Sequence, residues 1–257
     1  MDRFVDELIR VKEEGAAAVL ASVVEAGENG AVEPGDKCLI RDGSVKVGTI
    51  RHEGLLKAIL HEAEARLREE RSKLVPLEVP NTRGKVEVFF EVLPSPPKLI
   101  VVGAGHIALP LVKFAKVMDF HVTVLDDRIL FANRERFPDA DQILVGDMAA
   151  TLKGLPVTPS TYIILITRGH KYDEPCLREI IHSPAKYIGM IGSKRRTKAC
   201  FQRFREEEKI AEEILQRVYA PIGLDIKAET PEEIALCILA EIVKVRRGGK
   251  AQSLSGH

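Results

Sequence analysis

The chain has 257 residues, 45% of them hydrophobic and 30% charged, which suits a globular protein of one large domain or two modest ones. Thirty-eight basic side chains balance 38 acidic ones and only 5% of residues are aromatic, so neither a nucleic acid nor an anionic membrane is an expected partner. No apolar run approaches the roughly 20 residues that span a bilayer, and the N-terminus is acidic rather than signal-like, so we expect a cytoplasmic protein.

Residues 1–93 predict a small mixed α+β domain. Apolar residues at helical spacing predict a helix over residues 2–14, and "AAVLASVVEA" predicts a buried strand that ends at the turn "GENG". Asp42-Gly43 between two apolar runs predicts a hairpin. An amphipathic helix in "GLLKAILHEAEARLREERSK" and a half-buried strand in "KVEVFFEVL" follow. None of these elements carries a motif that names a chemistry.

A change of composition marks a domain boundary at "LPSPPK", because three prolines in a short stretch can continue neither a helix nor a central strand. We therefore predict a linker over residues 94–97, a second domain over residues 98–246 and a flexible tail over residues 247–257.

The second domain alternates strands with helices. The runs "KLIVVG", "HVTVLD", "QILVG", "TYIILIT" and "KYIGMIG" are short, β-branched and almost wholly apolar, as parallel strands covered on both faces are. Helices are predicted at Ile107–Met118, Glu174–His182 and Ser193–Glu208. This order predicts an α/β protein whose second domain is a Rossmann-type, doubly wound parallel sheet.

The segment "VVGAGHIA" has the G-x-G-x-x-A pattern of a dinucleotide-binding loop, with Gly103, Gly105 and Ala108 in the marked positions and His106 between them. The first glycine permits the tight turn, the second lets a pyrophosphate approach the backbone, and the small third residue lets helix and strand pack closely. Asp126 follows 21 residues after Gly105, where an acid would bind the ribose hydroxyls. Such a Rossmann cradle can also be empty or re-used.

The neighbouring Arg128 leaves both NAD and NADP open as ligands, because an arginine there accommodates a 2′-phosphate. One interpretation of the loop is an NAD(P)-dependent oxidoreductase with His170 as proton donor. Another is a non-enzymatic NAD(P)-binding scaffold. Against the first, little chain remains beyond the sheet for a separate substrate domain.

The segment "LITRGHKYDEPCL" places Arg168, Gly169, His170 and Asp173 after the carboxyl end of a strand, the edge at which open α/β sheets bind ligands. His170 could act as an acid or base, ligate a metal, contact a phosphate, or only bond the backbone of a loop. One histidine with one aspartate is not a metal set, and the four scattered cysteines show no C-x-x-C spacing. We therefore assign no metal ligand and expect most of the cysteines to be buried thiols.

A second strand, glycine and helix start occurs in "YIGMIGSKRR". Gly189 and Gly192 would allow close backbone approach, and Ser193 is a predicted N-cap. Lys194, Arg195 and Arg196 add three positive charges at a positive helix end. An anion would bind well there, although a solvated basic turn without a ligand is the alternative. We expect the amides of this turn and of the 103–108 loop to converge on one shared anion.

The chain ends with "APIGLDI", an apolar loop expected to close over the ligand edge of the sheet, and with a helix that Thr230-Pro231-Glu232-Glu233 opens as a capping box.

Taken together, "GAGHIA", "TRGHKYD", "YIGMIGSKRR" and "PIGLDIKAETPEEIA" resemble, in that order, the motifs of the XdhC/CoxI family. The resemblance covers residues 98–245 and implies a small N-terminal α+β domain followed by a Rossmann domain. It also implies an accessory protein for molybdenum-dependent hydroxylases of the xanthine dehydrogenase type, more a chaperone than a catalyst. Such a protein binds the molybdenum cofactor, protects it during sulfuration by a cysteine desulfurase, and delivers it to the apo-hydroxylase.

The N-terminal domain departs from the family pattern, in which "GTI" is followed by glycines. Here Arg51, His52 and Glu53 take those places, where charged side chains would block the approach of a ligand to the backbone. Cofactor sites are therefore expected in the second domain, and no catalytic residue is assigned. The ligand is the molybdenum cofactor or NAD(P), and we expect a homodimer.

Overall fold

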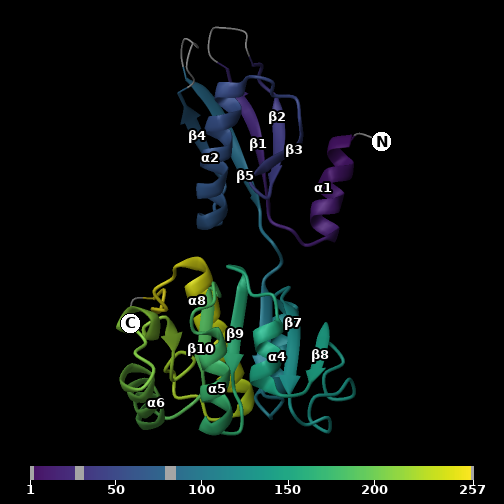
Figure 1. The fold of residues 1–257 in the computed structure, drawn as a ribbon. Helices are drawn as coiled ribbons and strands as arrows, with labels where there is room; N and C mark the ends of the chain where they lie inside the picture. The colour runs from purple at the N-terminus through teal and green to yellow at the C-terminus, as the bar shows by residue number, and fades with distance from the viewer. Residues whose placement is uncertain (1–2, 27–31, 79–84, 256–257) are drawn as a thin grey trace. The chain divides into compact units, whose positions relative to one another are not determined.

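A computed structural model describes residues 3–26, 32–78 and 85–255. The chain divides into two compact units, Met1–Pro96 and Pro97–His257, and each has its own sheet and its own core (Figure 1). The predicted turn "GENG" lies outside the described residues. Among the helices of the described ranges, none combines the length and apolarity that crossing a bilayer requires.

The first unit is an antiparallel sheet in the order β3-β2-β1-β5-β4. The apolar side of helix α2 packs on one face, and helix α1 contributes Phe4 and Val11 to a second cluster with Leu39. The elements are α1 Arg3–Glu13, β1 Ala18–Glu25, β2 Lys37–Arg41, β3 Ser44–Gly48, α2 Glu53–Glu69, β4 Lys73–Leu77 and β5 Val86–Leu93.

The hairpin prediction is confirmed at Asp42 and Gly43, which join β2 to β3 with φ angles of 52° and 66°. Strand β4 was not predicted, because Pro76 interrupts the apolar pattern and its first residue was assigned to the preceding helix. The strand lies at the edge of the sheet, where the missing N–H of a proline costs no ladder bond.

The second unit is a parallel six-stranded sheet in the order β11-β10-β9-β6-β7-β8, so the predicted Rossmann-type sheet is confirmed. The predicted apolar runs form β6 Lys98–Val102, β7 His121–Asp126, β8 Gln142–Val145, β9 Thr161–Leu165 and β10 Tyr187–Met190. Strand β11, Val218–Tyr219, is too short to leave a periodic pattern and was missed.

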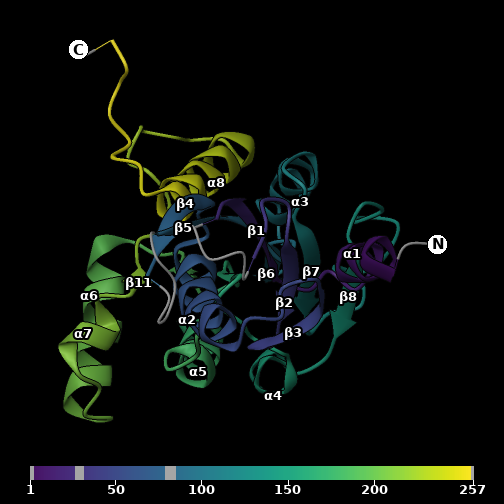
Figure 2. The same cartoon turned by 90° about the horizontal axis from the view of Figure 1, so that it is seen from above.

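Helices cover both faces of this sheet (Figure 2). Helices α3, Ala108–Val117, and α8, Pro231–Arg247, pack with one core cluster, and α4, Met148–Gly154, α5, His170–Ile180, and α6, Lys194–Glu206, pack with the other. A short helix, α7, spans Glu212–Leu215. The capping box at Thr230 and Glu233 is confirmed at the start of α8.

One boundary was wrong in a way that matters for the site. Helix α5 begins at His170 rather than at the predicted Glu174, so Pro175 lies inside the helix and not at its start. His170 and Asp173 therefore belong to a helix N-terminus and not to a loop.

The four cysteines are buried and free, as expected for thiols that serve as small apolar residues. Burial raises the pKa of the Cys176 and Cys200 thiols to about 12, so both stay protonated at neutral pH.

Candidate functional site

The carboxyl ends of β6 and β9 form the switch point of the parallel sheet. The chain runs from β6 outward through β7 and β8 and then returns to place β9 on the other side of β6. In sheets of this kind the two diverging loops leave a crevice in which ligands bind. The loop that ends β6 contains the glycine motif, and the loop that ends β9 contains Thr167, Arg168 and Gly169.

The two glycines of the glycine loop have different roles. Gly103 has a φ of +106°, and a Cβ there would lie 2.5 Å from the carbonyl oxygen of Ile166, so only glycine lets β6 and β9 close up. A Cβ on Gly105 would meet nothing within 4 Å, so open space lies above that residue. Ala108 is fully buried where α3 packs on the sheet, and His106 is exposed.

The N-termini of α3 and α5, which follow these two loops, differ from those of α4, α6 and α8 and share with the short α7, within the described residues, the lack of a side-chain cap. Helices α4, α6 and α8 each begin with a side chain that accepts a hydrogen bond from the first turn. In the part of the chain that the structure describes, no side chain caps α3 or α5 in that way. The crevice is thus flanked by two positive helix ends whose N–H groups suit an anion.

Asp126, at the end of β7, is almost fully buried and has four donors around its carboxylate. Oδ1 accepts from the backbone N and the Nε of Arg128 at 3.0 and 2.8 Å. Oδ2 accepts from the backbone N of Ala104 at 2.8 Å and from Nη2 of Arg128 at 3.0 Å. Burial alone would raise the pKa of this carboxyl, but the bonds from Arg128 and Ala104 outweigh it and lower the pKa to about 2.

Asp127 and Arg168 link the loops on either side of β6. The Nη1 and Nη2 atoms of Arg168 donate to the two oxygens of Asp127 at 2.7 and 2.6 Å, and Nη2 also bonds the hydroxyl of Tyr172. Asp127 follows β7 and Arg168 follows β9, so their ion pair spans the carboxyl end of β6. The bonds to Asp127 and Tyr172 raise the pKa of the Arg168 guanidinium.

Arg136 is a residue of this site that sequence reasoning missed. Its Nη1 donates to the carbonyl oxygens of Ala104 and Phe131, both at 2.9 Å, so it fixes the glycine loop from the side opposite Asp126. No local pattern singles it out, because it lies in an irregular segment, "RILFANRERFPD", that contains three arginines.

Asp173 is buried beneath the loop after β9, whereas His170 is exposed. Thr167 donates from Oγ1 to Oδ1 of Asp173 at 2.5 Å, and burial is the main cause that raises the pKa of this carboxyl. His170, Asp173 and Arg196 border a cavity of only about 10 Å³. That volume holds at most one water molecule, so these side chains support the crevice wall rather than line a second ligand chamber.

The turn after β10 lies on the same edge of the sheet, but β9 separates it from β6. Two strand spacings are about 10 Å, so the two glycine turns do not converge on one shared anion, and that expectation was wrong. Gly189 is also not a place of ligand approach, because a Cβ there would lie 2.4 Å from Cδ1 of Ile222. The prediction that Ser193 caps α6 is confirmed, since its Oγ accepts from the backbone N of Arg196.

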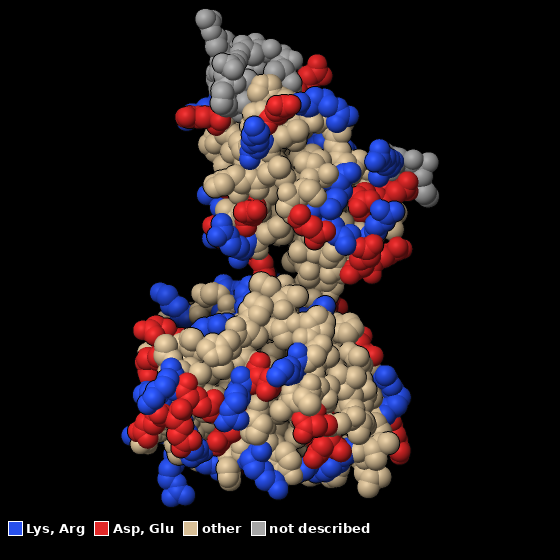
Figure 3. Space-filling model, in the orientation of Figure 1, with Lys and Arg blue, Asp and Glu red and all other residues tan. Residues whose placement is uncertain are grey.

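Lys194 and Arg195 are exposed on the first turn of α6, with Gly192 partly buried before them. Within the described ranges neither cation takes part in an ion pair shown by the structure. Lys194 borders an open groove of about 450 Å³, which is also lined by Thr197, Lys198, Phe201, Arg205, Ala220 and Pro221. On the face drawn in Figure 3, basic and acidic side chains are interspersed, in line with the balanced composition.

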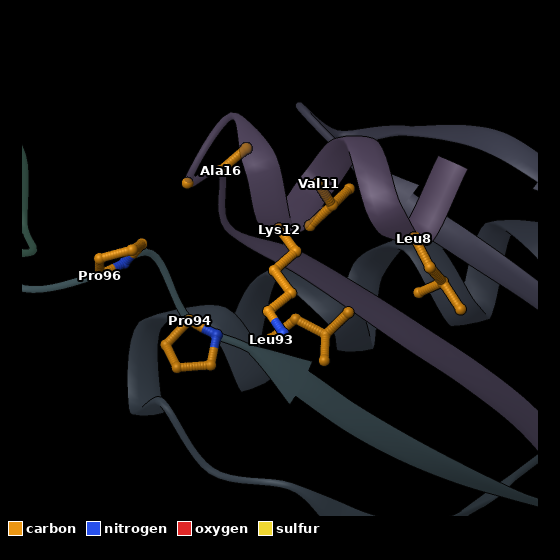
Figure 4. Close-up of a pocket in the computed structure, with 8 residues that line it drawn as sticks. Leu8, Val11, Lys12, Ala16, Leu93, Pro94 and Pro96 are labelled. Carbon is orange, nitrogen blue, oxygen red and sulfur yellow. The ribbon is translucent and has the colours of Figure 1, made fainter. Parts of the chain in front are cut away.

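The first unit carries a mainly apolar pocket of about 290 Å³ where α1 meets the end of β5 (Figure 4). Leu8, Val11, Lys12, Gly15, Ala16, Leu93, Pro94 and Pro96 line it. Of the three residues that replace the family glycines, His52 has a structural use, because its Nδ1 accepts from the backbone N of Leu55 at 3.2 Å and caps α2. The described residues contain no group of three or more His, Cys, Asp or Glu side chains placed to share a metal ion.

Comparisons with known proteins agree with the architecture. Residues 99–242 match the family model of the XdhC Rossmann domain. The chain is 27% identical over 267 residues to an uncharacterized protein, YqeB, of Escherichia coli K12, covering 98% of the chain and 49% of that protein. It is 28% identical over 184 residues to a probable xanthine dehydrogenase subunit of Bacillus subtilis, covering 72% of the chain and 53% of that protein.

A crystal structure described as a xanthine dehydrogenase from Bacillus halodurans superposes with a TM-score of 0.55, with 98% of each chain covered and 19% identity. At that identity the likeness concerns the fold alone. The chain spans about half the length of the curated relatives that it matches.

Proposed function

Because the chain belongs to the XdhC family, we propose that it is an accessory protein for the maturation of a molybdenum-dependent hydroxylase of the xanthine dehydrogenase type. The observation that carries this proposal is the pair of helix N-termini, α3 and α5, which flank the crevice without side-chain caps. Together with the open space above Gly105, they offer a site for a phosphate-bearing ligand. The name of the B. subtilis relative supports the choice of partner enzyme.

The residues at the crevice fit the phosphate of the molybdenum cofactor. The amides around Gly105 and His106 would hold the phosphate, Gly105 leaves the backbone open to it, and the guanidinium groups of Arg128 and Arg168 lie at the rim. When bound, the cofactor supplies the molybdenum centre and its pterin. The chain would bind it, shield it from water and release it to the apo-hydroxylase, without making or breaking a bond itself.

Sulfuration of the cofactor would come from a separate cysteine desulfurase. A sulfur-carrying cysteine needs an accessible thiolate, whereas the thiols of this chain are buried and their pKa values are raised by burial. The role left to this chain is therefore to hold the cofactor while another protein modifies it.

The proposal is tested by two measurements, one of the small molecules that the chain binds and one of their transfer to a hydroxylase. Mass spectrometry of small molecules released from the natively purified chain is expected to detect a pterin phosphate, and the chain is expected to restore activity to a hydroxylase made without it. Gly105→Ala should reduce both signals. Gly154→Ala, which also places a Cβ where nothing lies within 4 Å, is the matched control. Retention of neither pterin nor nucleotide, together with failure to restore the hydroxylase, would overturn the proposal, as would turnover of NAD(P)H with a carbonyl or alcohol substrate.

We place the contact of the proposed homodimer on an exposed apolar face of α3 and α8. Phe114, Val117, Leu236 and Val243 remain 38, 84, 55 and 38% exposed beside an apolar groove of about 420 Å³. Helix α8 is acidic in its first turn and basic in its last, so an antiparallel second copy brings opposite charges together.

Light scattering at about 100 μM protein is expected to give the mass of a dimer and, for Leu236→Glu, the mass of a monomer. Leu254→Glu in the fully exposed tail is the control. A monomeric wild type, or a dimer that Leu236→Glu leaves intact, would place the contact elsewhere.

A further inference from the structure

We propose that Arg128 determines which ligands the crevice accepts: by capping the carboxylate of Asp126 it excludes the adenosine ribose of NAD and reserves the rim for a phosphate ester. The inference rests on the proposed function, in that it takes the crevice to be a ligand site. It goes beyond that function by naming the residue that sets which class of ligand the crevice accepts.

The first step concerns the free capacity of Asp126. A carboxylate has about four acceptor positions, and those of Asp126 already receive four hydrogen bonds, three from Arg128 and one from Ala104. A dinucleotide-binding acid needs free lone pairs for the two ribose hydroxyls. Asp126 has none to spare, because its acceptors hold the glycine loop and the turn after β7.

The second step concerns the strength of the cap. The Nε and Nη2 atoms of Arg128 reach the two oxygens of Asp126 separately, and a bidentate, charged pair of this kind is stronger than bonds to neutral hydroxyls. The guanidinium carbon also lies 3.7 Å from the centroid of the Phe131 ring. A ribose would have to displace Arg128 from both Asp126 and Phe131. The hydrogen bonds that its neutral hydroxyls could form are weaker than the charged bonds that would be lost.

The third step concerns what the rim can bind instead. The side chain of Arg128 is one-third exposed, and the charge of Arg168 acts on it from the loop after β9. Within the described part of the chain, the hydrogen bonds shown by the structure use neither Nη1 of Arg128 nor Nε of Arg168. These two N–H groups are suited to the oxygens of a phosphate.

Calorimetry on the full chain tests the cap with four probes: NAD, NADP, inorganic pyrophosphate and neopterin triphosphate. The wild type is expected to bind pyrophosphate and neopterin triphosphate. It is expected to bind NAD at least about tenfold more weakly than the Arg128→Ala variant does, because one or two hydrogen bonds to a charged acceptor account for a factor of that size. NADP carries an additional phosphate on its ribose. Comparing its affinity with that of neopterin triphosphate distinguishes a dinucleotide phosphate from a pterin phosphate as the anion that binds at the rim. Arg128→Gln, which keeps one donor, should gain NAD affinity to a smaller degree.

A double variant and a matched control make the result specific. In Arg128→Ala/Asp126→Asn the gain of NAD affinity should disappear, because the gain is attributed to the uncovered carboxylate. Arg178→Ala removes a bidentate pair of the same kind, with Glu208 at 2.9 and 2.5 Å, away from the crevice, and should change binding of no probe. Thermal melting of each variant establishes that it is folded.

Tight binding of NAD by the wild type would overturn the inference, and so would a folded Arg128→Ala variant with no gain. Neither result depends on whether a hydroxylase is matured. Failure of this inference is therefore distinguishable from failure of the proposed function.

Discussion

Arg168 holds Asp127 through both Nη atoms, at 2.7 and 2.6 Å, although 41 residues separate the two in the chain. The pair joins the loop after β7 to the loop after β9, and β6 lies between those strands. It therefore braces the carboxyl end of β6, beside the loop that is proposed to hold a phosphate. Both side chains are about one-third exposed, which makes the brace easy to open.

Breaking the Asp127–Arg168 pair should strengthen anion binding without unfolding the protein. Asp127→Ala is expected to change the free energy of unfolding by less than about 1 kcal/mol, as for other partly exposed ion pairs. It should tighten pyrophosphate binding about threefold to tenfold at low salt, because Arg168 becomes available to the ligand. Calorimetry in low salt and in about 0.5 M salt checks this, since the gain should shrink on screening. Glu212→Ala, which breaks a surface pair with Arg205, is the control, and equal affinities in all three proteins would contradict the prediction.

Asp126 should make the fold sensitive to acid. Its pKa is lowered from 3.8 to about 2 in the folded protein, so its carboxylate stabilises the fold above about pH 4. That contribution, about 2 kcal/mol for such a shift, is lost as the pH falls from about 4 toward 2. Urea unfolding across this range should show a steeper loss for wild type than for Asp126→Asn. The exposed Asp139→Asn serves as the control, and parallel curves for wild type and Asp126→Asn would refute the assignment.

The two glycines of the loop should separate stability from binding. Gly103→Ala forces a positive φ on alanine and a contact of 2.5 Å with Ile166, and should cost about 2–4 kcal/mol of unfolding free energy. Gly105→Ala meets open space and should leave stability within about 0.5 kcal/mol while weakening pyrophosphate binding. Denaturant unfolding and calorimetry on both variants check the pattern. A stable Gly103→Ala protein, or undiminished binding by Gly105→Ala, would be the contrary result.

Tyr187 and Glu241 should be energetically coupled inside the second unit. The Tyr187 hydroxyl donates to Oε2 of Glu241 at 2.6 Å, and the same oxygen accepts from the backbone N of Gly223 at 3.0 Å. Burial raises the pKa of the Tyr187 hydroxyl, which therefore remains a donor at neutral pH.

Tyr187→Phe is expected to cost about 1–3 kcal/mol, because it leaves a buried carboxylate with one donor fewer. A double-mutant cycle with Glu241→Gln, followed by denaturant unfolding, should give a coupling of about 1 kcal/mol or more. Additive costs would mean that the two groups act independently.

Much of the fold was predictable because the physics that forms it is local. Parallel strands buried on both faces must be apolar throughout, so β6, β7, β8, β9 and β10 were visible as apolar runs. The elements that were missed are those whose signal is weak or broken: the edge strand β4 with its proline, the two-residue strand β11, and the short helices α4 and α7.

The site shows the same division. The glycine loop, the acid after β7 and the segment after β9 were all found by spacing, and the four ordered motifs led to the family. Spacing does not report distance between separate strands, so the sequence could not exclude one shared anion for two turns that lie on either side of β9. Arg136, which holds the loop across 32 residues, carries no local signature.

The alternation of strands and helices, the family, and the residues at the carboxyl edge of the parallel sheet could all be read from the sequence. How those residues are used could be seen only in the folded chain: Asp126 is saturated by Arg128 and Ala104, Ile222 fills the space above Gly189, and Arg168 reaches across to Asp127. The difference arises from the range of the interactions. Periodicity and turn chemistry act between neighbours in the chain, whereas the capacity of a carboxylate for one more hydrogen bond depends on partners that only folding brings within about 3 Å.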